Sequence, residues 1–156
     1  MKKLVYIFLL LFNVAAAQQQ TNNNFTGKVV AVKDGDTFKV LYNGKAQTIR
    51  LAHIDCPEKS QPYGNKAKQF AANLCFGKEV RVVTTKQRDR YRRTIAVIFV
   101  NDSINVNKEL VKAGYAWHYK QYSKDTSYYM LEQIARKNKA GLWQDKKASP
   151  PWLWRK

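Results

Sequence analysis

The chain has 156 residues, of which 45% are hydrophobic and 13% aromatic, and it carries 28 Lys and Arg against 11 Asp and Glu, a formal charge of +17. This length accommodates one domain with a real hydrophobic core and excludes a second. The positive charge narrows the partners to polyanions, either nucleic acid or an anionic membrane surface.

The first 17 residues have the pattern of an export signal. Lys2 and Lys3 precede an apolar run over 4–14, and three alanines at 15–17 form a small-residue cleavage site. The apolar run is too short to span a bilayer comfortably, so we favour a cleaved signal peptide over the alternative, a membrane anchor. No cysteine stands near the cleavage site, which argues against a lipoprotein. We therefore predict a secreted or periplasmic protein with no stable membrane association once the signal peptide, residues 1–17, is removed.

A short lead-in and one domain are predicted to follow. Residues 18–24 are rich in Gln, Asn and Thr, a composition typical of disorder. Residues 25–156 form the domain, for which we expect a monomer. Apolar residues alternate at the start of this domain, which predicts three strands, at 27–33, 37–42 and 47–54.

Two turns join these strands. The first is Asp34-Gly35-Asp36, and the second is Asn43-Gly44, a dipeptide suited to a tight hairpin. Two further strand patterns, at 79–85 and 94–100, are joined by a charged loop over 86–93. The three strands of the first meander and these two, with one helix between the third and fourth, match the plan of a Greek-key barrel of the OB type.

The helix between the strands spans 65–75, where Ala67, Phe70, Ala71 and Leu74 recur at helical spacing. A short helix is predicted over 106–113, ending before Gly114, and a longer one over 126–140. The stripe that we expect the longer helix to bury consists of Met130, Leu131, Ile134 and Ala135. The Pro150-Pro151 pair prevents helix continuation. The predicted class is therefore α+β, mainly β, a five-stranded barrel with about three packed helices.

Carboxylates are scarce in this chain, and four of the eleven fall in two short stretches, Asp34-Gly35-Asp36-Thr37 and Arg50 to Glu58. Asp36 and Asp55 are hard oxygen ligands of the kind that Ca²⁺ prefers. Glu58 follows within three residues of Asp55, and it can orient or deprotonate a metal-associated water. A small acidic pocket in a basic surface can hold a divalent cation against a phosphate.

Arginines complete this pattern. Arg50 and one of Arg92 or Arg93 can bind phosphate oxygens in the bidentate geometry that favours Arg over Lys. Each motif alone has a plain structural explanation, since Asp-Gly-Asp is common in hairpin turns and an Arg-rich loop is usually a solvated face. Their joint order favours metal-dependent cleavage of nucleic acid over binding alone.

Taken together, these motifs resemble the staphylococcal nuclease (thermonuclease) family from about Gly27 to Trp143. The Asp34–Thr37 turn and the Arg50–Glu58 block are the most specific parts, and a supporting match consists of Asn107, Leu110, Val111 and Gly114. The resemblance implies a Ca²⁺-dependent enzyme on an OB-fold barrel. It further implies cleavage of DNA and RNA with little sequence preference, single-stranded or locally open substrates being favoured, and 3′-phosphate ends.

The resemblance also implies roles for individual residues. The calcium ligands would be Asp36, Asp55 and the backbone carbonyl of Cys56. The catalytic set would be Glu58, acting on the attacking water, with Arg50 and Arg93 neutralising the phosphate. Substrate contacts would come from Arg90 and Tyr91 to other phosphates, and from Tyr119 and Tyr122 stacking on a base.

The chain departs from the family pattern at three places. Cys56 replaces the usual Thr, the loop from Glu58 to Tyr63 is short, and Tyr91-Arg92-Arg93 stands where Tyr-Gly-Arg is usual. The third departure puts a β-carbon where Gly allows free backbone choice, so the choice between Arg92 and Arg93 stays open, with Arg93 preferred by position.

Several features have two interpretations. Cys56 and Cys75, 19 residues apart, either form a disulfide or fill separate core positions. His53 and His118 lack the spacing of a zinc site; we expect His53 to lie on a strand, and His118 to pack or to line the edge of the groove. The Trp residues at 143, 152 and 154 are expected to anchor the C-terminal tail. The alternative to a nuclease is a non-catalytic OB-fold module that binds nucleic acid through basic and aromatic side chains.

Overall fold

The structure is a computed structural model that describes residues 24–86 and 88–155. The predicted export signal, and residues 18–23 of the predicted lead-in, lie outside this part of the chain. Asn24, the last residue of the lead-in, accepts a hydrogen bond from the backbone N–H of Thr84 at 3.1 Å. Among the described residues, none of the helices is both long enough and apolar enough to cross a membrane.

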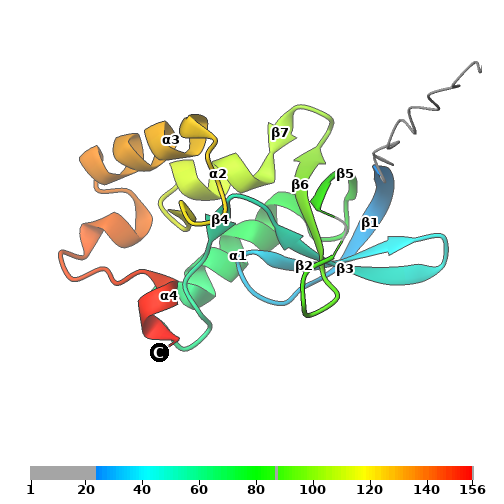
Figure 1. Ribbon diagram of the computed structural model, residues 1–156, viewed down its shortest axis with the longest axis horizontal. Coiled ribbons are helices and arrows are strands. Elements are labelled where there is room, and N and C mark those ends of the chain that lie inside the picture. The colour runs from blue at the N-terminus through cyan, green and yellow to red at the C-terminus, as the bar shows by residue number, and fades with distance from the viewer. Residues whose placement is uncertain (1–23, 87, 156) are drawn as a thin grey trace, which may run out of the picture.

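In the described chain, five strands close into a barrel (Figure 1). The barrel strands are β1 (Phe25–Val32), β2 (Thr37–Tyr42), β3 (Lys45–Leu51), β5 (Glu79–Lys86) and β6 (Thr94–Val100). Neighbouring strands pair antiparallel in the order β3-β2-β1-β5-β6, and a parallel β3–β6 pairing closes the ring. The predicted five-stranded OB-type barrel is confirmed.

The barrel interior is filled by side chains that alternate along the strands. Phe38 and Val40 on β2, Ile49 on β3, Val82 on β5 and Ile98 on β6 are all fully buried. Burying each such side chain contributes about 1.5–3 kcal/mol relative to exposure. The alternation read from the sequence therefore has its physical cause in one continuous core.

The third predicted strand, 47–54, is in fact interrupted. β3 ends at Leu51, and Ile54 begins β4 (Ile54–Asp55), because His53 adopts a φ of 70° that no regular strand allows. β4 pairs antiparallel with β8 (Trp117–His118), so that Asp55 lies opposite Trp117. The pairing brings the aromatic segment after β8 to the acidic end of β4. A further short strand, β7 (Ile104–Asn105), pairs with β6.

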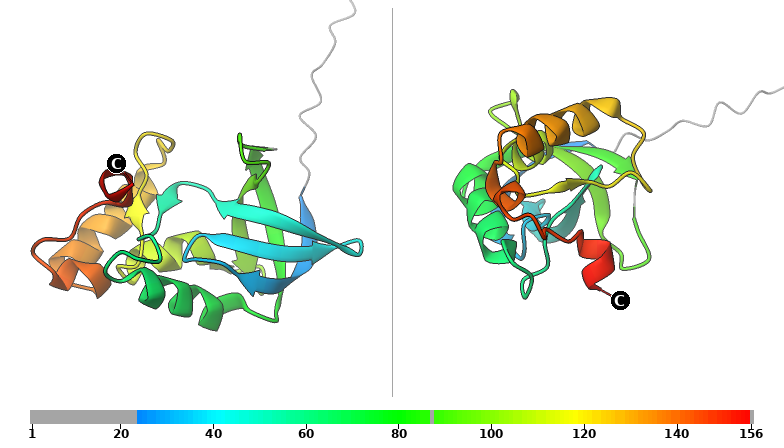
Figure 2. Two further views of the ribbon diagram at one scale, coloured as in Figure 1. Left: turned by 90° about the horizontal axis from the view of Figure 1, so that it is seen from below. Right: turned by 90° about the vertical axis from the view of Figure 1, so that its left-hand side faces the viewer.

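Three helices match the expected positions; the first two pack against the barrel, and the third packs against the second. They are α1 (Gly64–Cys75), α2 (Val106–Lys112) and α3 (Thr126–Lys137). On α1, Ala67 and Ala71 are buried while Phe70 and Leu74 pack against the core, which confirms the predicted apolar face. Figure 2 shows the barrel at one end of the molecule, with α3 and α4 gathered at the other.

The predicted buried stripe of α3 is wrong in part. Met130 and Ile134 are 57% and 50% exposed. Ala135 is buried as expected, and Leu131 is partly buried against the core. The remaining buried positions of α3 are Tyr128 and Glu132.

The helix is rotated because Glu132 has hydrogen-bond partners inside. Its carboxylate accepts the backbone N–H of His118 at 2.8 Å and the Nε of Arg136 at 2.8 Å. A paired carboxylate tolerates burial, whereas an unpaired one does not. This pairing depends on β8, so the apolar pattern of α3 alone did not reveal it.

The C-terminal segment contains a short 3-10 helix, η1 (Gly141–Gln144), and α4 (Pro151–Trp154). The Pro pair was expected only to stop a helix, but Pro151 instead occupies the first turn of α4, where its missing N–H costs nothing. Trp143 and Trp152 pack edge-on against Trp117, with ring centroids 4.3 and 5.8 Å away. They anchor the tail as predicted.

Both cysteines are free and buried. Cys75, on α1, lies in the hydrophobic core, and its thiol lies 3.0 Å from the carbonyl of Ala71. Cys56 follows β4 and packs against the turn that contains Gly35. Of the two interpretations of the cysteine pair, the structure therefore has the one with separate core positions.

Candidate active site

The acidic turn and the third strand are brought together by barrel pairing. Thr37, at the start of β2, pairs with Arg50 on β3, and the backbone N–H of Leu51 donates to the carbonyl of Asp36 at 2.8 Å. Asp36 therefore lies just before the start of β2, directly beside the strand that carries Arg50. Asp55, on β4, returns to the same place after the turn at His53.

A glycine permits the close approach of the two acidic stretches. A Cβ at Gly35 would lie 2.8 Å from both the Cβ and the Sγ of Cys56, and 2.9 Å from the Cβ of Ala67. Real Cβ atoms do not approach other heavy atoms so closely. With Gly35 in the turn, the backbone N–H of Cys56 donates to Asp36 Oδ2 at 2.7 Å.

Arg50 lies at the centre of this arrangement and is 9% exposed. Its Nη2 lies 2.8 Å from Asp55 Oδ1 and 3.2 Å from Asp36 Oδ2. Its Nη1 donates to the carbonyls of Leu51 at 2.6 Å and Ile54 at 2.9 Å. The guanidinium thus fixes the two predicted calcium ligands and the backbone between them.

The carboxylates remain crowded despite Arg50. Two effects raise the pKa of Asp34 to about 6 and that of Asp55 to about 7: burial is the larger, and repulsion from Asp36 is the second. The pKa of Arg50 is also raised: burial alone would lower it, but Asp36 and Asp55 outweigh burial. Additional positive charge at this place would therefore stabilise the ionised carboxylates.

Glu58 lies just outside the buried cluster. Its backbone N–H donates to the side-chain oxygen of Gln61 at 3.1 Å, and its carbonyl accepts the N–H of Gln61 at 2.9 Å. Its carboxylate lies 3.2 Å from the Nε of Arg155, and the Nη2 of Arg155 is paired with Asp55 Oδ2. Arg155 therefore bridges the carboxylate predicted to act on the attacking water, Glu58, and a predicted metal ligand, Asp55.

Arg93 is held by its own loop. Asp89 accepts from the backbone N–H and the Nε of Arg93, each at 2.9 Å. Arg92, the residue before it, has a φ of 62°, the left-handed conformation that Gly favours. Thr94, the residue after Arg93, pairs with Ile49, which places Arg93 close in register to Arg50.

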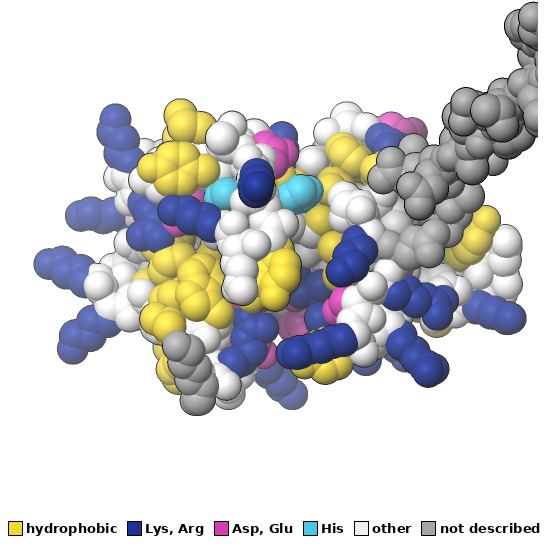
Figure 3. Space-filling view, in the orientation of Figure 1, with side chains coloured by type: hydrophobic (Ala, Val, Ile, Leu, Met, Phe, Trp, Pro, Cys, Tyr) yellow, Lys and Arg dark blue, Asp and Glu magenta, His cyan; other side chains and the backbone are white. Residues whose placement is uncertain are grey.

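The other predicted substrate residues form two groups. Tyr91 is exposed, and the guanidinium groups of Arg90 and Arg93 lie 4.8 and 5.2 Å from its ring centroid. Tyr122 is 71% exposed and meets Tyr119 edge-on at 4.8 Å. Figure 3 shows a face dominated by Lys and Arg, with a small acidic area enclosed by basic side chains and a hydrophobic patch beside it.

Two residues of the site were not predicted, Trp152 and Arg155. The indole of Trp152 stacks on the ring of Tyr119 at 5.3 Å with an angle of 4°. Trp152 was expected only as a packing anchor, and Arg155 was not singled out. The sequence offered no signal for either, because 100 residues separate Arg155 from Asp55.

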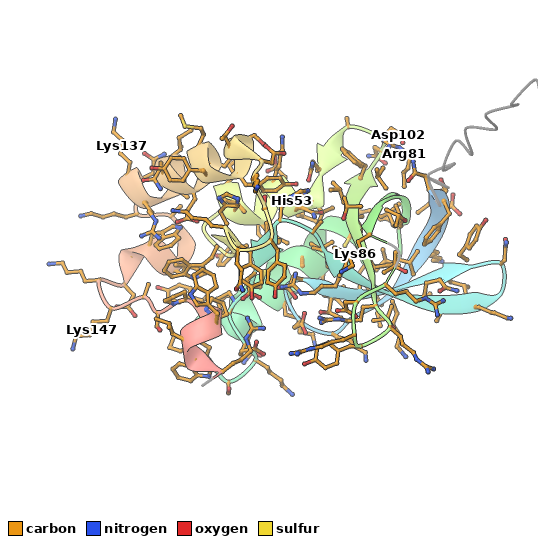
Figure 4. All side chains as sticks on the ribbon, viewed as in Figure 1. His53, Arg81, Lys86, Asp102, Lys137 and Lys147 are labelled. Atoms are coloured by element: carbon orange, nitrogen blue, oxygen red, sulfur yellow. The ribbon has the colours of Figure 1, made fainter. Side chains whose placement is uncertain are left out.

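The two histidine predictions have different outcomes: His118 packs in the interior as expected, whereas His53 lies outside any strand. His53, at the turn between β3 and β4 (Figure 4), has its Nδ1 2.9 Å from Ser123 Oγ and stacks on Tyr128 at 4.8 Å. His118 is buried in β8. Burial lowers the pKa of both imidazoles, which favours their neutral forms.

The described residues contain no group of three or more His, Cys, Asp or Glu side chains that could hold a metal alone. Any cation here would rely on the carboxylates of Asp36 and Asp55, with backbone carbonyls and waters completing its shell. Such an all-oxygen, incomplete set suits a hard cation such as Ca²⁺. Two guanidinium groups, those of Arg50 and Arg155, already pair with Asp55, so positive charge lies against this donor set in the structure.

Comparisons with known proteins agree with this geometry. The model of the family described as "Staphylococcal nuclease homologue" matches residues 48–145. An "Uncharacterized endonuclease" of Escherichia coli is 46% identical over 129 residues, 83% of this chain and 84% of that protein. One of Haemophilus influenzae is 42% identical over 156 residues, 99% of this chain and 85% of that protein.

A protein of Shigella flexneri called "Micrococcal nuclease" is 41% identical over 143 residues, 85% of this chain and 82% of that protein. The matched region includes Arg50, Asp55, Glu58 and Arg93. Arg50 lies at the end of β3 that pairs with the start of β6, the strand that follows Arg93. The similarity to these proteins covers most of the chain at more than 40% identity. The chain therefore belongs to the staphylococcal nuclease homologue family.

Proposed function

We propose that the protein is an exported, Ca²⁺-dependent nuclease that hydrolyses the phosphodiester bonds of DNA and RNA with little sequence preference and leaves 3′-phosphate ends. The observation that carries this proposal is the convergence of Asp36, Arg50 and Asp55 at one buried point, with Glu58 beside it. A module that only binds nucleic acid has no use for the carboxylates of Asp36, Asp55 and Glu58 close together in a protein whose formal charge is +17.

Calcium, when bound by Asp36, Asp55 and the carbonyl of Cys56, would supply positive charge to the scissile phosphate and lower the pKa of a nearby water. Arg50 keeps both aspartates in place and adds a permanent positive charge to the same point. Because Arg50 is buried, with three side-chain hydrogen bonds and a further ion pair to Asp36, its position is preorganised before substrate arrives.

Glu58 serves as the general base. Its side chain is 40% exposed, so water reaches it, and the hydrogen bonds between its backbone and Gln61 fix the loop from which it projects. A carboxylate in this position accepts the proton of the attacking water as the water oxygen bonds to phosphorus and the bond between phosphorus and the 5′-oxygen breaks; the leaving 5′-oxygen takes a proton from solvent. Such a general base contributes about 10²–10⁴-fold to the rate.

Arg93 approaches the phosphate from the loop before β6, and Asp89 orients its guanidinium. Arg90 and Tyr91, exposed on the same loop, contact neighbouring phosphates. Tyr119 and Tyr122 stack on a base, which contributes about 1–3 kcal/mol for each stacked base and favours single-stranded or open substrates. These contacts carry no base code, so little sequence preference is expected.

A cleavage assay tests this proposal directly. Supercoiled plasmid and single-stranded RNA are incubated with the mature protein in Ca²⁺ and in EGTA. The proposal predicts nicking and RNA degradation in Ca²⁺ alone. Nucleic-acid binding without cleavage in either condition would instead identify the protein as a binding module. End-labelling of the products before and after phosphatase treatment tests the 3′-phosphate.

Export has its own test. Expression of the full chain in a Gram-negative host, followed by fractionation and intact-mass measurement, is expected to give a soluble extracytoplasmic form that lacks residues 1–17. Recovery of the uncleaved chain in the membrane fraction would favour the membrane anchor instead.

A further inference from the structure

The C-terminal helix α4 reaches back across the candidate active site. Arg155, at the end of α4, donates to Asp55 Oδ2 through its Nη2 and lies 3.2 Å from Glu58 Oε1 through its Nε. Asp55 Oδ1 is already taken by Arg50 at 2.8 Å. Both oxygens of this proposed metal ligand are therefore bound to guanidinium groups.

The same helix also covers the proposed base platform. The indole of Trp152 lies parallel to the Tyr119 ring, at 5.3 Å and 4°. A nucleobase stacked on that face of Tyr119 would need the space that Trp152 occupies. The proposed complex needs Asp55 for the metal and Tyr119 for a base. In the structure, Arg155 is bound to Asp55 and Trp152 covers Tyr119.

Packing of Trp152 against Trp117 and Tyr119, together with a few polar contacts, holds the tail in this position. Gln61 Nε2 donates to the carbonyl of Ser149 at 2.5 Å, and Trp154 Nε1 lies 3.4 Å from Ser60 Oγ. Pro151 is buried, but Leu153 and Trp154 are 50% and 45% exposed. The Arg155 side chain is 45% exposed, so solvent screens its ion pairs. Segments with exposed side chains and screened ion pairs are among the parts of a fold that need the least free energy to open locally.

We propose that α4 is an autoinhibitory strap, in which Arg155 and Trp152 occupy the proposed calcium and base positions until Ca²⁺ and nucleic acid displace them. This inference rests on the proposed function, since it concerns the regulation of the same site. If the ligands bind only the form with the strap released, their apparent affinity is reduced by the fraction of molecules in that form. Calcium and single-stranded nucleic acid then each favour release, and each strengthens the binding of the other.

The competition is between chemically similar groups. A guanidinium and a divalent cation both neutralise carboxylates, so the same oxygen of Asp55 can bind either one. An indole and a nucleobase both offer a flat π-face to Tyr119. While substrate and metal are absent, the strap therefore pairs with the carboxylate of Asp55 and covers one face of the Tyr119 ring.

The test uses the full mature protein with Arg155→Gln, Arg155→Lys and Trp152→Ala. Arg81→Gln is the control because Arg81 is paired with Asp102 at 2.6 Å on β5, at the end of the molecule away from α4 (Figure 4). Calorimetry measures the Ca²⁺ affinity, and a short thymidine oligonucleotide is titrated with and without Ca²⁺. Hydrogen–deuterium exchange follows the amides of the tail from Ser149 to Arg155.

We expect Arg155→Gln to bind Ca²⁺ on the order of fivefold more tightly than the wild type, because Asp55 then no longer has to give up its partly exposed ion pair with Arg155. Trp152→Ala is expected to bind the oligonucleotide more tightly. In the wild type, Ca²⁺ together with the oligonucleotide should accelerate amide exchange in the tail. Arg81→Gln should match the wild type in all three measurements.

The measurements separate three ways in which the inference can fail. Calcium binding of equal affinity in all variants, with unchanged tail exchange, would overturn the strap and leave the nuclease proposal intact. Tighter binding by Arg155→Gln but not Arg155→Lys, again with unchanged exchange, would show a simple charge effect and likewise overturn the strap. Absence of calcium binding in every variant would overturn the calcium-dependent function and the strap together.

Discussion

Arg50 Nη2 lies 2.8 Å from Asp55 Oδ1, although β3, which carries Arg50, and β4, which carries Asp55, are separate strands divided by the turn at His53. The same Nη2 lies 3.2 Å from Asp36 Oδ2. This one guanidinium therefore joins the acidic turn before β2 to the acidic stretch after β3. Any change that displaces it would separate the two proposed calcium ligands.

Glu58→Gln is expected to lower kcat by about 10²–10⁴-fold while leaving DNA affinity close to that of the wild type, because the amide cannot accept the proton of the attacking water. Stopped-time plasmid cleavage measures kcat, and fluorescence anisotropy in EGTA measures affinity. Glu109→Gln is the matched control, since the ion pair of Glu109 within the described part of the chain is with Lys112 on α2. Wild-type turnover by Glu58→Gln would remove Glu58 from the mechanism.

Asp36→Asn is expected to weaken Ca²⁺ binding by about tenfold or more, because the ligand loses its charge and the calcium site loses one of two carboxylates. Isothermal titration calorimetry measures the change. Asp102→Asn serves as the control at the exposed pair with Arg81. If both variants titrate like the wild type, Asp36 is not a calcium ligand.

Arg93→Ala and Arg92→Ala are expected to differ. Arg93 is oriented by Asp89 next to the site, so its removal should lower kcat/KM by about 10²-fold through lost phosphate stabilisation. Arg92 is exposed in the turn, and its loss should change kcat/KM by no more than a few-fold. Steady-state kinetics on a short oligonucleotide compare the two. The reverse ranking would assign the phosphate contact to Arg92.

Asn107→Ala is expected to lower the free energy of unfolding by about 2–4 kcal/mol, because it leaves buried backbone groups without partners. Asn107 is fully buried, donates to the carbonyls of Ala52 and Ala96, and accepts from the N–H of Ile98 at 3.1 Å. Urea unfolding measures the loss. Asn73→Ala, at an exposed position of α1, should stay within about 0.5 kcal/mol of the wild type.

The pH dependence of stability provides a test of the crowded carboxylates. Folding raises the pKa of Asp34 from 3.8 to about 6, mainly through burial and then through Asp36, so the folded chain binds this proton more tightly than the unfolded chain. Between these two values the contribution of Asp34 to the free energy of unfolding therefore falls as pH rises.

Asp34→Asn removes this contribution and keeps an oxygen that can accept the Asp36 N–H. In EGTA, the free energy of unfolding of the variant, relative to the wild type, should increase as pH rises from about 4 to about 6. Urea titrations at intervals across that window measure it. A constant difference between the two proteins would mean that Asp34 ionises normally in the folded chain.

Local patterns were enough to predict the barrel and its acidic site. Alternating apolar residues define the strands because each strand has one face in the same core, as with Phe38 and Ile49. The positions of Asp36 and Asp55 followed from short motifs in which turn residues and carboxylates lie within a few residues of one another. Chemistry that depends on neighbouring residues can be inferred from the order of residues alone.

Other features depended on contacts between distant segments. The rotation of α3 is set by the hydrogen bonds of Glu132 to His118 and Arg136, so an apolar stripe that includes Met130 and Ile134 was misleading. The break of β3 at His53 arises from a left-handed backbone that its composition does not reveal.

By itself, the sequence determined which side chains can perform the chemistry, because residue type and local spacing decide what can bind a cation or a phosphate. Only the tertiary structure decided how those side chains are engaged: Arg50 between two aspartates, and Arg155 from the opposite end of the chain on Asp55. The reason is physical, since such contacts depend on the packing of whole elements across the fold, which no short stretch of residues encodes.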